Sequence, residues 1–276
     1  MKLGTVSTVF IFILLLIMTR SEKSDIKIIA HRGGSNLAPE NTMAAFQNAL
    51  DLGVDMIEID IEQTIDSVVV VIHDTKVDRT TNGKGKVDSL TYSYIKTLDA
   101  GSWFNTRFKG EKISTLEEVL EAVNGKATVL IEIKSGDERY PGIEKRTVEA
   151  IQRFNAHSWT IVQSFNKKTV ERVKILDNKI ITYYLLGRNF MSYYHSLQAK
   201  NKKNKTQEFL FDGIAVHYSM LNAASVDSVK QMGLGVFTWT VDEEDDMKKM
   251  IEFGVDGIIT DSPDKLIGLI KSRKVR

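Results

Sequence analysis

The sequence predicts an α/β fold of the TIM (β/α)8 barrel type, with a small insertion subdomain and an apolar leader ahead of the barrel. Short runs rich in Ile, Val, Thr and Tyr alternate with segments of helical period along the chain. Eight such runs are present, the strand number of a TIM barrel, and the chain from Ile26 onward holds about 250 residues, the usual size of that fold. A doubly wound open sheet shows the same alternation, so the pattern alone leaves that fold open.

The amino terminus differs from the rest of the chain. Lys2 precedes an uncharged stretch, Leu3–Met18, which contains the unbroken apolar run Val9–Met18. A helix of this length spans roughly 24 Å, less than the ~30 Å hydrocarbon core of a bilayer. A charged start followed by a short apolar segment is typical of an export signal. We therefore expect residues 1–24 to be a signal peptide or an uncleaved anchor, and the protein to be periplasmic or extracellular, either free or attached to the membrane through this leader.

The predicted strands follow the leader, and we assign residues 25–276 to the barrel. β-Branched and aromatic residues dominate these runs, as expected for buried parallel strands. Three of them come shortly after a glycine that ends a helix, in the segments DLGVDMIEID, QMGLGVFTW and EFGVDGIITD. The predicted strands are Lys27–Ala30, Met56–Glu62, Thr128–Lys134, Thr160–Ser164, Lys179–Leu185, Gly213–His217, Gly235–Thr240 and Gly257–Thr260.

The segments between the strands are predicted to be helices. Asn41-Thr42 and Ser114-Thr115 have side chains that can cap a helix start. We expect the lysine-rich segment Arg188–Glu208 to be a solvated surface around a poorly defined helix. The predicted helices are Thr42–Leu52, Leu116–Val123, Ile143–Phe154, Lys168–Leu176, Phe190–Lys200, Ser225–Met232, Glu243–Phe253 and Lys265–Lys271.

One stretch interrupts the alternation. A further strand-like run, Val68–Ile72, leads into His73 and Asp74, and the segment Thr75–Ser114 that follows shows no clean period. A structureless loop of this length is uncommon inside a compact domain, so we predict a small inserted subdomain over residues 75–114. The active site of a TIM barrel lies at the carboxyl ends of its strands, and an insertion in a loop at that end would cover the site.

The composition excludes several classes of protein. Hydrophobic residues make up 42% of the chain and charged residues 26%, as in ordinary globular proteins and unlike disordered ones. Lys and Arg total 37 against 36 Asp and Glu, so the chain lacks the basic excess of a nucleic-acid-binding protein and we expect no nucleic-acid partner. Cysteine is absent from the sequence, which excludes disulfides, a thiol nucleophile and a cysteine-based zinc site.

Polar side chains occur on or just after several predicted strands. His31 and Arg32 follow the first strand, and His73 follows the additional strand-like run. Glu58 and Asp60 lie two residues apart on the second strand, so their side chains share one face of it. A single histidine at a strand end is most often a hydrogen-bonded structural residue, so position alone does not make these residues catalytic.

The third strand repeats this spacing with Glu132 and Lys134. Glu–Lys pairs on strands are often solvated ion pairs. The alternating isoleucines of the second strand, however, must face the surrounding helices, so its carboxylates must point into the barrel, where burial is costly unless they are paired or bind a metal. Two carboxylates from one strand and a third from the next form a hard oxygen site suited to Ca²⁺ or Mg²⁺.

These residues belong to an ordered set of motifs. The blocks HRG, PENT, E-x-D, HD and TTNG follow one another from His31 to Gly83. The later blocks ISTLEEVLE, LIEIK, QSF, VFTWTVD and FGVDGIITDSP continue the pattern over nearly the whole chain after the leader. The set resembles the glycerophosphodiester phosphodiesterase family, whereas any single block would be unspecific.

The resemblance implies a TIM-barrel hydrolase of lipid and glycerol metabolism. It implies cleavage of glycerophosphodiesters, which are deacylated phospholipids, into glycerol 3-phosphate and an alcohol. By this resemblance His31 and His73 are the general acid/base pair. One divalent cation, Ca²⁺ or Mg²⁺, is expected as cofactor, with Glu58, Asp60 and Glu132 as its ligands.

The resemblance also assigns substrate contacts. Arg32 and Lys134 are implied to contact the phosphate, and Trp239 resembles the aromatic wall beside the glycerol moiety. The family usually has a lysine-aspartate-glycine hairpin turn where this chain reads Ile65-Asp66-Ser67, which leaves the type of that turn open.

The remaining histidines lie outside the motifs. We expect His157 and His195 to be surface or structural residues, and His217 is a candidate pocket residue because it follows the sixth strand.

Two other functions fit the same motifs. A phospholipase D-like activity on intact or lysophospholipids would need the same site with a wider entrance. A noncatalytic phosphodiester-binding protein is disfavoured, because a binding protein has no need of two proton-transferring histidines. The sequence does not disclose the head-group preference or the oligomeric state.

Overall fold

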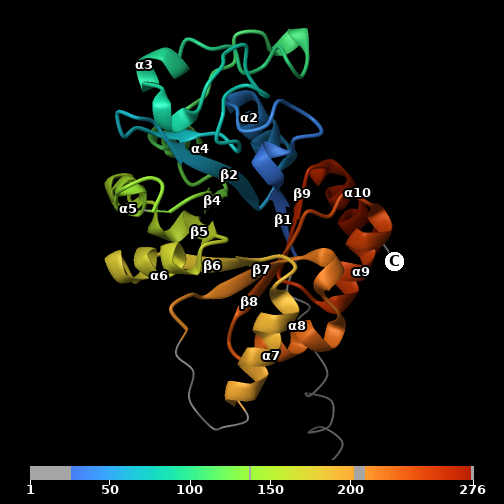
Figure 1. Ribbon diagram of the computed structural model, residues 1–276. Coiled ribbons are helices and arrows are strands. Elements are labelled where there is room, and N and C mark those ends of the chain that lie inside the picture. The colour runs from blue at the N-terminus through green and yellow to red at the C-terminus, as the bar shows by residue number, and fades with distance from the viewer. Residues whose placement is uncertain (1–25, 137, 202–208, 275–276) are drawn as a thin grey trace, which may run out of the picture.

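The computed structural model describes residues 26–136, 138–201 and 209–274, and in it eight parallel strands close into a barrel (Figure 1). The closure is made by β1, which pairs in parallel with β9 on one side and with β2 on the other. The predicted TIM barrel is thereby confirmed, and the open sheet is excluded. The barrel strands are β1 (Lys27–Ala30), β2 (Met56–Gln63), β4 (Thr128–Ile133), β5 (Thr160–Ser164), β6 (Ile181–Leu186), β7 (Gly213–His217), β8 (Gly235–Trp239) and β9 (Gly257–Thr260).

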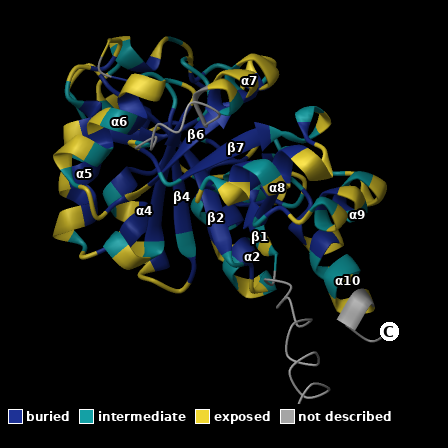
Figure 2. Ribbon diagram, turned by 90° about the horizontal axis from the view of Figure 1, so that it is seen from below, coloured by how far each residue is buried: buried dark blue, intermediate teal, exposed yellow. Residues whose placement is uncertain are grey.

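Helices follow the strands and cover the outside of the barrel, with exposed residues on their outer faces and buried strands at the centre (Figure 2). Short 3-10 turns occur in several loops, among them η1 (His31–Gly33), η4 (His157–Trp159) and η5 (Tyr218–Met220). The main helices are α2 (Met43–Leu52), α4 (Leu116–Val123), α5 (Ile143–Arg153), α6 (Lys167–Leu176), α7 (Phe190–Asn201), α8 (Ala223–Gln231), α9 (Glu244–Phe253) and α10 (Pro263–Lys274).

The predicted element boundaries lie close to the observed ones, with two differences described next. The strand predicted to begin at Lys179 begins at Ile181, and the Ile180 carbonyl just before it accepts a hydrogen bond from Lys174 Nζ (2.9 Å). The helix predicted to begin at Lys265 begins at Pro263, whose fixed φ suits the first helical position.

Capping side chains begin two of the helices as predicted. Thr42 accepts a hydrogen bond from the Ala45 amide at the start of α2. Thr115 and Glu118 form a reciprocal capping box at the start of α4.

The predicted solvated surface over Arg188–Glu208 is only partly correct. Phe190, Tyr194 and Leu197 of α7 are buried against β6, β7 and α8 at the four- and three-residue spacing of one helical face. The lysines of this segment begin only at Lys200, after the apolar stripe, so they do not describe the helix itself. Residues 202–208 lie outside the described part of the chain.

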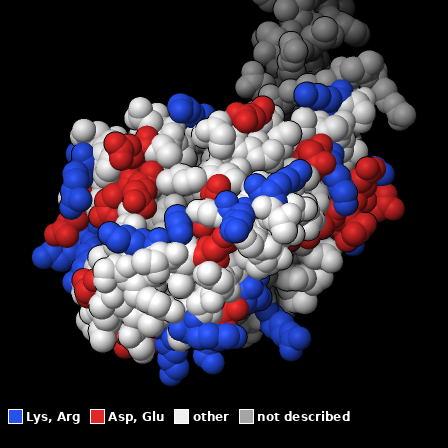
Figure 3. All heavy atoms as spheres, turned by 90° about the horizontal axis from the view of Figure 1, so that it is seen from above, with Lys and Arg blue, Asp and Glu red and all other residues white. Residues whose placement is uncertain are grey.

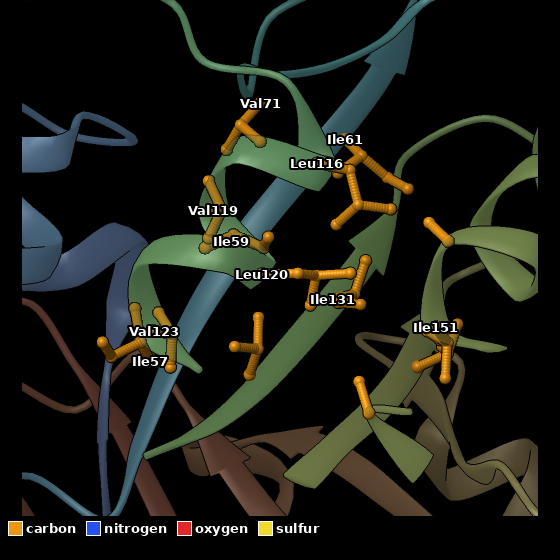
Figure 4. Close-up of a cluster of buried hydrophobic side chains, with 14 of the residues drawn as sticks. Ile57, Ile59, Ile61, Val71, Leu116, Val119, Leu120, Val123, Ile131 and Ile151 are labelled. Carbon is orange, nitrogen blue, oxygen red and sulfur yellow. The ribbon is translucent and has the colours of Figure 1, made fainter. Parts of the chain in front are cut away.

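The strands of the barrel wall have two distinct faces. Ile57, Ile59 and Ile61 of β2 point outward and pack with α4 and α5 residues such as Leu120 and Ile151 (Figure 4). The alternate residues of β2 point inward, as the alternating isoleucines predict. The helices therefore bury the apolar face, and the polar face is enclosed by the barrel.

The interior of the barrel is filled by large side chains opposite glycines. Tyr183 of β6 and Phe237 of β8 stack with ring centroids 4.3 Å apart. A Cβ at Gly213 would lie 2.4 Å from the Tyr183 ring, and one at Gly257 would lie 2.9 Å from Phe237, so only glycine leaves room for these rings.

A ninth strand, β3 (Val69–Val71), pairs antiparallel with β2 through a tight hairpin. Its turn has no glycine, and Ser67 adopts the left-handed conformation with φ of 65°. The Thr64 side chain supports this turn by accepting a hydrogen bond from the Val68 amide (2.9 Å). A serine therefore takes the position where the family pattern has glycine, and the hairpin is retained.

The segment that follows β3 contains η2 (Val87–Ser89), α3 (Tyr92–Ile95) and η3 (Thr106–Phe108). It forms the upper part of the molecule in Figure 1, beside α2 and α4. Its apolar side chains make a small cluster of their own with the end of β3: Val70, Ile72, Val77, Val87, Ile95, Leu98, Ala100 and Ile113. This segment is where the sequence shows no clean period, because its elements are too short for one.

The predicted leader, residues 1–24, lies outside the described residues. Among the helices that the structure describes, none has the length and apolar character needed to cross a bilayer. Seen from above, positive and negative side chains are interspersed on the surface (Figure 3), in keeping with the balanced composition.

Candidate active site

The polar residues singled out in the sequence meet at the carboxyl ends of the barrel strands. A cavity of about 100 Å³ is formed there. Its walls include seven of the eight predicted site residues, and the eighth, Asp60, is fully buried beside them. The cavity is lined by His31, Arg32, Glu58, His73, Glu132, Lys134, Gln163, Phe165, Leu185, Trp239, Thr240 and Ile259.

The turn after β1 places His31 and Arg32 at the cavity. Arg32 has a left-handed φ of 52°, a strained conformation for a residue other than glycine. The next residue, Gly33, has a φ of 85°, and a Cβ there would lie 2.7 Å from Ala45 Cβ. The backbone can therefore turn this sharply against α2 only because residue 33 is glycine, and the turn aims the Arg32 amide at Glu58 Oε2 (2.9 Å).

Three buried carboxylates form the floor of the site. Glu58 and Asp60 project from β2, and Glu132 projects from β4, where it lies opposite Asp60 in the strand register. One oxygen from each of the three lies within 4.8 Å of the others. Burial and the neighbouring charge of Asp60 raise the pKa of Glu58 to about 8.

Two cations lie beside these carboxylates. Lys134 Nζ is 2.7 Å from Glu132 Oε1 and 3.4 Å from Asp60 Oδ1, and Arg32 Nε is 3.3 Å from Asp60 Oδ2. Burial opposes ionisation of Asp60, but Lys134 and Arg32 outweigh it and lower its pKa. Asp60 is further fixed by Asn41, whose amide nitrogen donates to Asp60 Oδ2 (2.8 Å).

The donor set fits a divalent cation. Glu58 Oε1 is buried and accepts no hydrogen bond, and the buried Asp60 Oδ1 and Glu132 Oε1 have only the Lys134 ammonium beside them. Buried acceptors are normally satisfied, so three converging carboxylate oxygens with so few donors are what a hard cation would bind. Among the described residues, this trio is the one group of His, Asp and Glu side chains with such spacing.

The first histidine is oriented by an aspartate that the sequence analysis did not single out. His31 Nδ1 is 2.6 Å from Asp261 Oδ1, at the end of β9, and its Nε2 is 4.0 Å from Glu58 Oε2. Burial alone would lower the pKa of His31, but the bond to Asp261 and the charge of Glu58 raise it. The carboxylate holds the proton on Nδ1 and leaves Nε2 for the cavity.

The second histidine is held in the same way. His73 Nδ1 lies 2.8 Å from Asp74 Oδ1. Asp74 in turn accepts a hydrogen bond from Arg79 Nε (2.7 Å), which comes from the inserted segment. Burial lowers the pKa of His73. Both imidazoles therefore have Nδ1 fixed by a carboxylate.

The chain of ion pairs continues from Arg79 through Glu40 to Arg32. Glu40 accepts hydrogen bonds from both Arg79 (2.7 and 2.8 Å) and Arg32 (2.8 Å). Burial opposes the ionisation of Glu40, but the two arginines outweigh it and lower its pKa. An unbroken path thus links His73 through Asp74, Arg79 and Glu40 to Arg32.

An aromatic wall closes the opposite side of the cavity. Trp239 ends β8 and donates its indole N–H to the Ala215 carbonyl (3.1 Å). Phe165, from the loop after β5, meets it edge to face with ring centroids 5.4 Å apart. This apolar surface suits the carbon skeleton of a small polyol.

The other histidines lie outside the cavity. His157 pairs with Asp177 (2.9 Å), between α5 and α6, and His195 is exposed on α7. His217, the candidate pocket residue, does not line the cavity but packs edge to face on Trp239 (5.1 Å). It supports the aromatic wall from behind.

Sequence reasoning missed the residues that position the site. Asp74 and Asp261 hold the two histidines, and Glu40, Arg79 and Phe165 complete the walls and the ion-pair chain. Four of them lie in quoted motif blocks (HD, FGVDGIITDSP, PENT and QSF), and Arg79 directly precedes the block TTNG. The signal was therefore present in the sequence, but no spacing rule indicates which acid faces which histidine.

Comparison with known proteins agrees with this geometry. The model of the glycerophosphoryl diester phosphodiesterase family matches residues 31–265. A glycerophosphodiester phosphodiesterase of Caldanaerobacter subterraneus subsp. tengcongensis is 42% identical over 245 residues, which are 88% of this chain and 97% of that protein. One from Bacillus subtilis is 36% identical over 250 residues, 86% of this chain and 83% of that protein. The solved structure of an Oleispira antarctica phosphodiesterase in complex with the product sn-glycerol-3-phosphate superposes with a TM-score of 0.76 at 28% identity, covering 89% of this chain and 96% of that one.

Proposed function

The chain belongs to the glycerophosphoryl diester phosphodiesterase family, and we propose that it hydrolyses glycerophosphodiesters to glycerol 3-phosphate and an alcohol. The observation that carries this proposal is one shared cavity. Two carboxylate-held imidazoles, His31 and His73, open onto the same space as three buried carboxylates and two cations. The product complex of the Oleispira relative supports the glycerol 3-phosphate half of the substrate.

The chain's own cations make attack on the phosphodiester possible. A phosphodiester anion repels nucleophiles, and charge accumulates on its nonbridging oxygens in the transition state. Arg32 and Lys134 line the cavity and are held there by Glu40, Asp60 and Glu132. We propose that they bind the phosphate and offset that charge.

The two histidines provide proton transfer. One removes the proton from the glycerol 2-hydroxyl as its oxygen bonds to phosphorus, and the other protonates the alcohol oxygen as its bond to phosphorus breaks. Water then opens the cyclic phosphate with the two roles reversed. Because each Nδ1 is fixed by an aspartate, both imidazoles exchange protons through Nε2.

Glu58, Asp60 and Glu132 would hold the divalent cation, Ca²⁺ or Mg²⁺. When bound, such an ion supplies Lewis-acid polarisation of a phosphoryl oxygen. The chain's contribution is the set of three converging carboxylate oxygens, arranged on two adjacent strands. Replacing Glu132 by Gln leaves the shape of the site but removes one charged ligand, and we expect it to weaken cation binding in a calorimetric titration.

A coupled assay for glycerol 3-phosphate tests the proposal. Purified protein is stripped with EDTA and supplied with Ca²⁺, Mg²⁺ or no ion, using glycerophosphodiesters with several alcohols and one lysophospholipid. We expect turnover of the glycerophosphodiesters that EDTA abolishes and added cation restores. Release of head group from the lysophospholipid alone would favour the phospholipase D-like activity, and binding without turnover would favour the noncatalytic alternative.

We also propose export, on the strength of the leader over residues 1–24 alone. Cell fractionation followed by mass determination of the protein distinguishes a cleaved signal peptide from a retained anchor. Full-length protein in the cytosol would contradict the proposal.

A further inference from the structure

A second hollow adjoins the cavity described above. It is open to solvent, with a volume of about 430 Å³, and shares His73 and Lys134 with the cavity that contains Trp239. A phosphodiester has two arms joined at phosphorus. If the phosphate lies at the shared residues and the glycerol lies against Trp239, the second hollow is where the alcohol arm has room. Its lining is Glu62, His73, Asp74, Thr75, Lys76, Lys134 and Ser135.

Glu62 is the unusual residue of this hollow. It follows Asp60 on the inward face of β2, is fully buried, and neither of its carboxylate oxygens accepts a hydrogen bond. Burial raises the pKa of Glu62 to about 7, and the nearby Tyr140 hydroxyl opposes this shift only in part. A buried carboxylate without a charged partner carries a desolvation cost, so its retention at a cavity wall points to a ligand.

The other charges of the hollow already have partners or lie in water. Asp74 is paired with Arg79, and Lys134 is paired with Glu132. Lys76 is exposed, so water screens its charge. Over the described part of the chain, Glu62 has no Lys, Arg or His within salt-bridge distance, and Arg139, the nearby cation, is paired with Asp88 (2.8 Å). Among the described residues, Glu62 is therefore the acidic group of this hollow that has no cationic partner.

We propose that this hollow binds the alcohol arm of the substrate and that Glu62 selects alcohols bearing a primary ammonium group, as in ethanolamine. A primary ammonium donates hydrogen bonds that a carboxylate and the hydroxyls of Thr75 and Ser135 can accept. A trimethylammonium group has no N–H and is normally bound by aromatic rings, of which the lining offers none besides the His73 imidazole. This inference rests on the proposed function, because it assigns one arm of the same substrate.

The wild-type enzyme gives the first test, which needs no variant. We compare kcat/KM for glycerophosphoethanolamine, glycerophosphocholine and glycerophosphoglycerol at saturating cation. One charge-assisted hydrogen bond to a buried carboxylate predicts a preference of about tenfold for the ethanolamine diester over both others. Equal values for the three substrates would overturn the inference.

Glu62→Gln gives the second test, since it keeps the shape and removes the charge. We expect the ratio of kcat/KM for the ethanolamine diester to that for the glycerol diester to fall about tenfold, mainly through KM. The matched control is Glu138→Gln. It removes an exposed carboxylate from the loop after β4, where Glu138 pairs with Lys168 of α6. That ratio should stay within twofold of wild type in the control.

The possible results separate the two proposals. An unchanged ratio in Glu62→Gln, or an equal fall in Glu138→Gln, refutes the role of Glu62 while leaving the phosphodiesterase intact. A wild-type protein that hydrolyses none of the three diesters refutes the proposed function itself. Thermal melting of each variant confirms that the compared proteins are folded.

Discussion

The two halves of the barrel interior differ in polarity. On β2 and β4 the inward side chains nearest the cavity are charged, with Glu58, Asp60 and Glu132 all buried, while Met56 and Leu130 of the same strands belong to the apolar cluster. On β6 to β8 they are apolar, and the Tyr183–Phe237 stack fills the space. Burying apolar area stabilises the fold, whereas burying carboxylates opposes it. The charged half therefore lowers the stability of the fold and supplies the proposed active-site groups. Substitutions there should mainly change activity, and substitutions in the apolar half should mainly change stability.

The largest effect is expected in the charged half. His31→Ala and His73→Ala should each lower kcat by ~10²–10⁴-fold, the usual contribution of one acid/base group. Melting temperatures should change little, because both side chains line a cavity and leave no packed core behind. Turnover above about 1% of wild type in both variants would contradict the acid/base roles.

The apolar half should respond in the opposite way. Phe237→Ala removes a ring that is 3% exposed and stacked on Tyr183, and we expect it to lower the free energy of unfolding by ~3–5 kcal/mol. Urea denaturation measures this loss. The kcat of the fraction that remains folded should stay close to wild type. A large fall in kcat without loss of stability would show that the two halves are not separable.

A smaller effect is expected where the inserted segment meets the charged half. Arg79→Ala cuts the path from Asp74 to Glu40 and should lower kcat by ~10-fold, because His73 and Arg32 lose orientation while remaining present. Arg79→Lys keeps the charge but not the bidentate hydrogen bonds, so its kcat should lie between those of Arg79→Ala and wild type. Full activity of Arg79→Ala would show that Asp74 and Glu40 position the site unaided.

The smallest effect concerns an ion pair away from the cavity. Hydrogen bonds from Gln152 and His157 lower the pKa of Asp177 to about 2. Because the folded pKa lies below its unfolded value of about 4, the stabilisation is present above pH 4 and is lost as the pH falls toward 2. Asp177→Asn should therefore be less stable than wild type at pH 7 and equal to it near pH 2, with kcat unchanged. Chemical denaturation at the two pH values measures the difference.

Much of this arrangement could be predicted from the sequence, because successive side chains on a strand point to opposite faces of the sheet. The isoleucines of β2 had to face helices, so Glu58 and Asp60 had to face inward. The partners of the histidines could not be predicted in this way. Asp261 is 230 positions from His31, and only strand register brings them together. Glu62 was passed over because no motif marks it, although the same alternation places it on the inward face of β2.

The pairing of His31 with Asp261 has a consequence for folding during synthesis. Asp261 leaves the ribosome 230 residues after His31, and the two meet only when β9 docks beside β1. A nascent or truncated chain can hold most of the barrel and still lack a properly aimed imidazole. If His31 transfers protons as proposed, phosphodiester cleavage requires β9 to be in place beside β1, and chains in which β9 has not docked should be inactive.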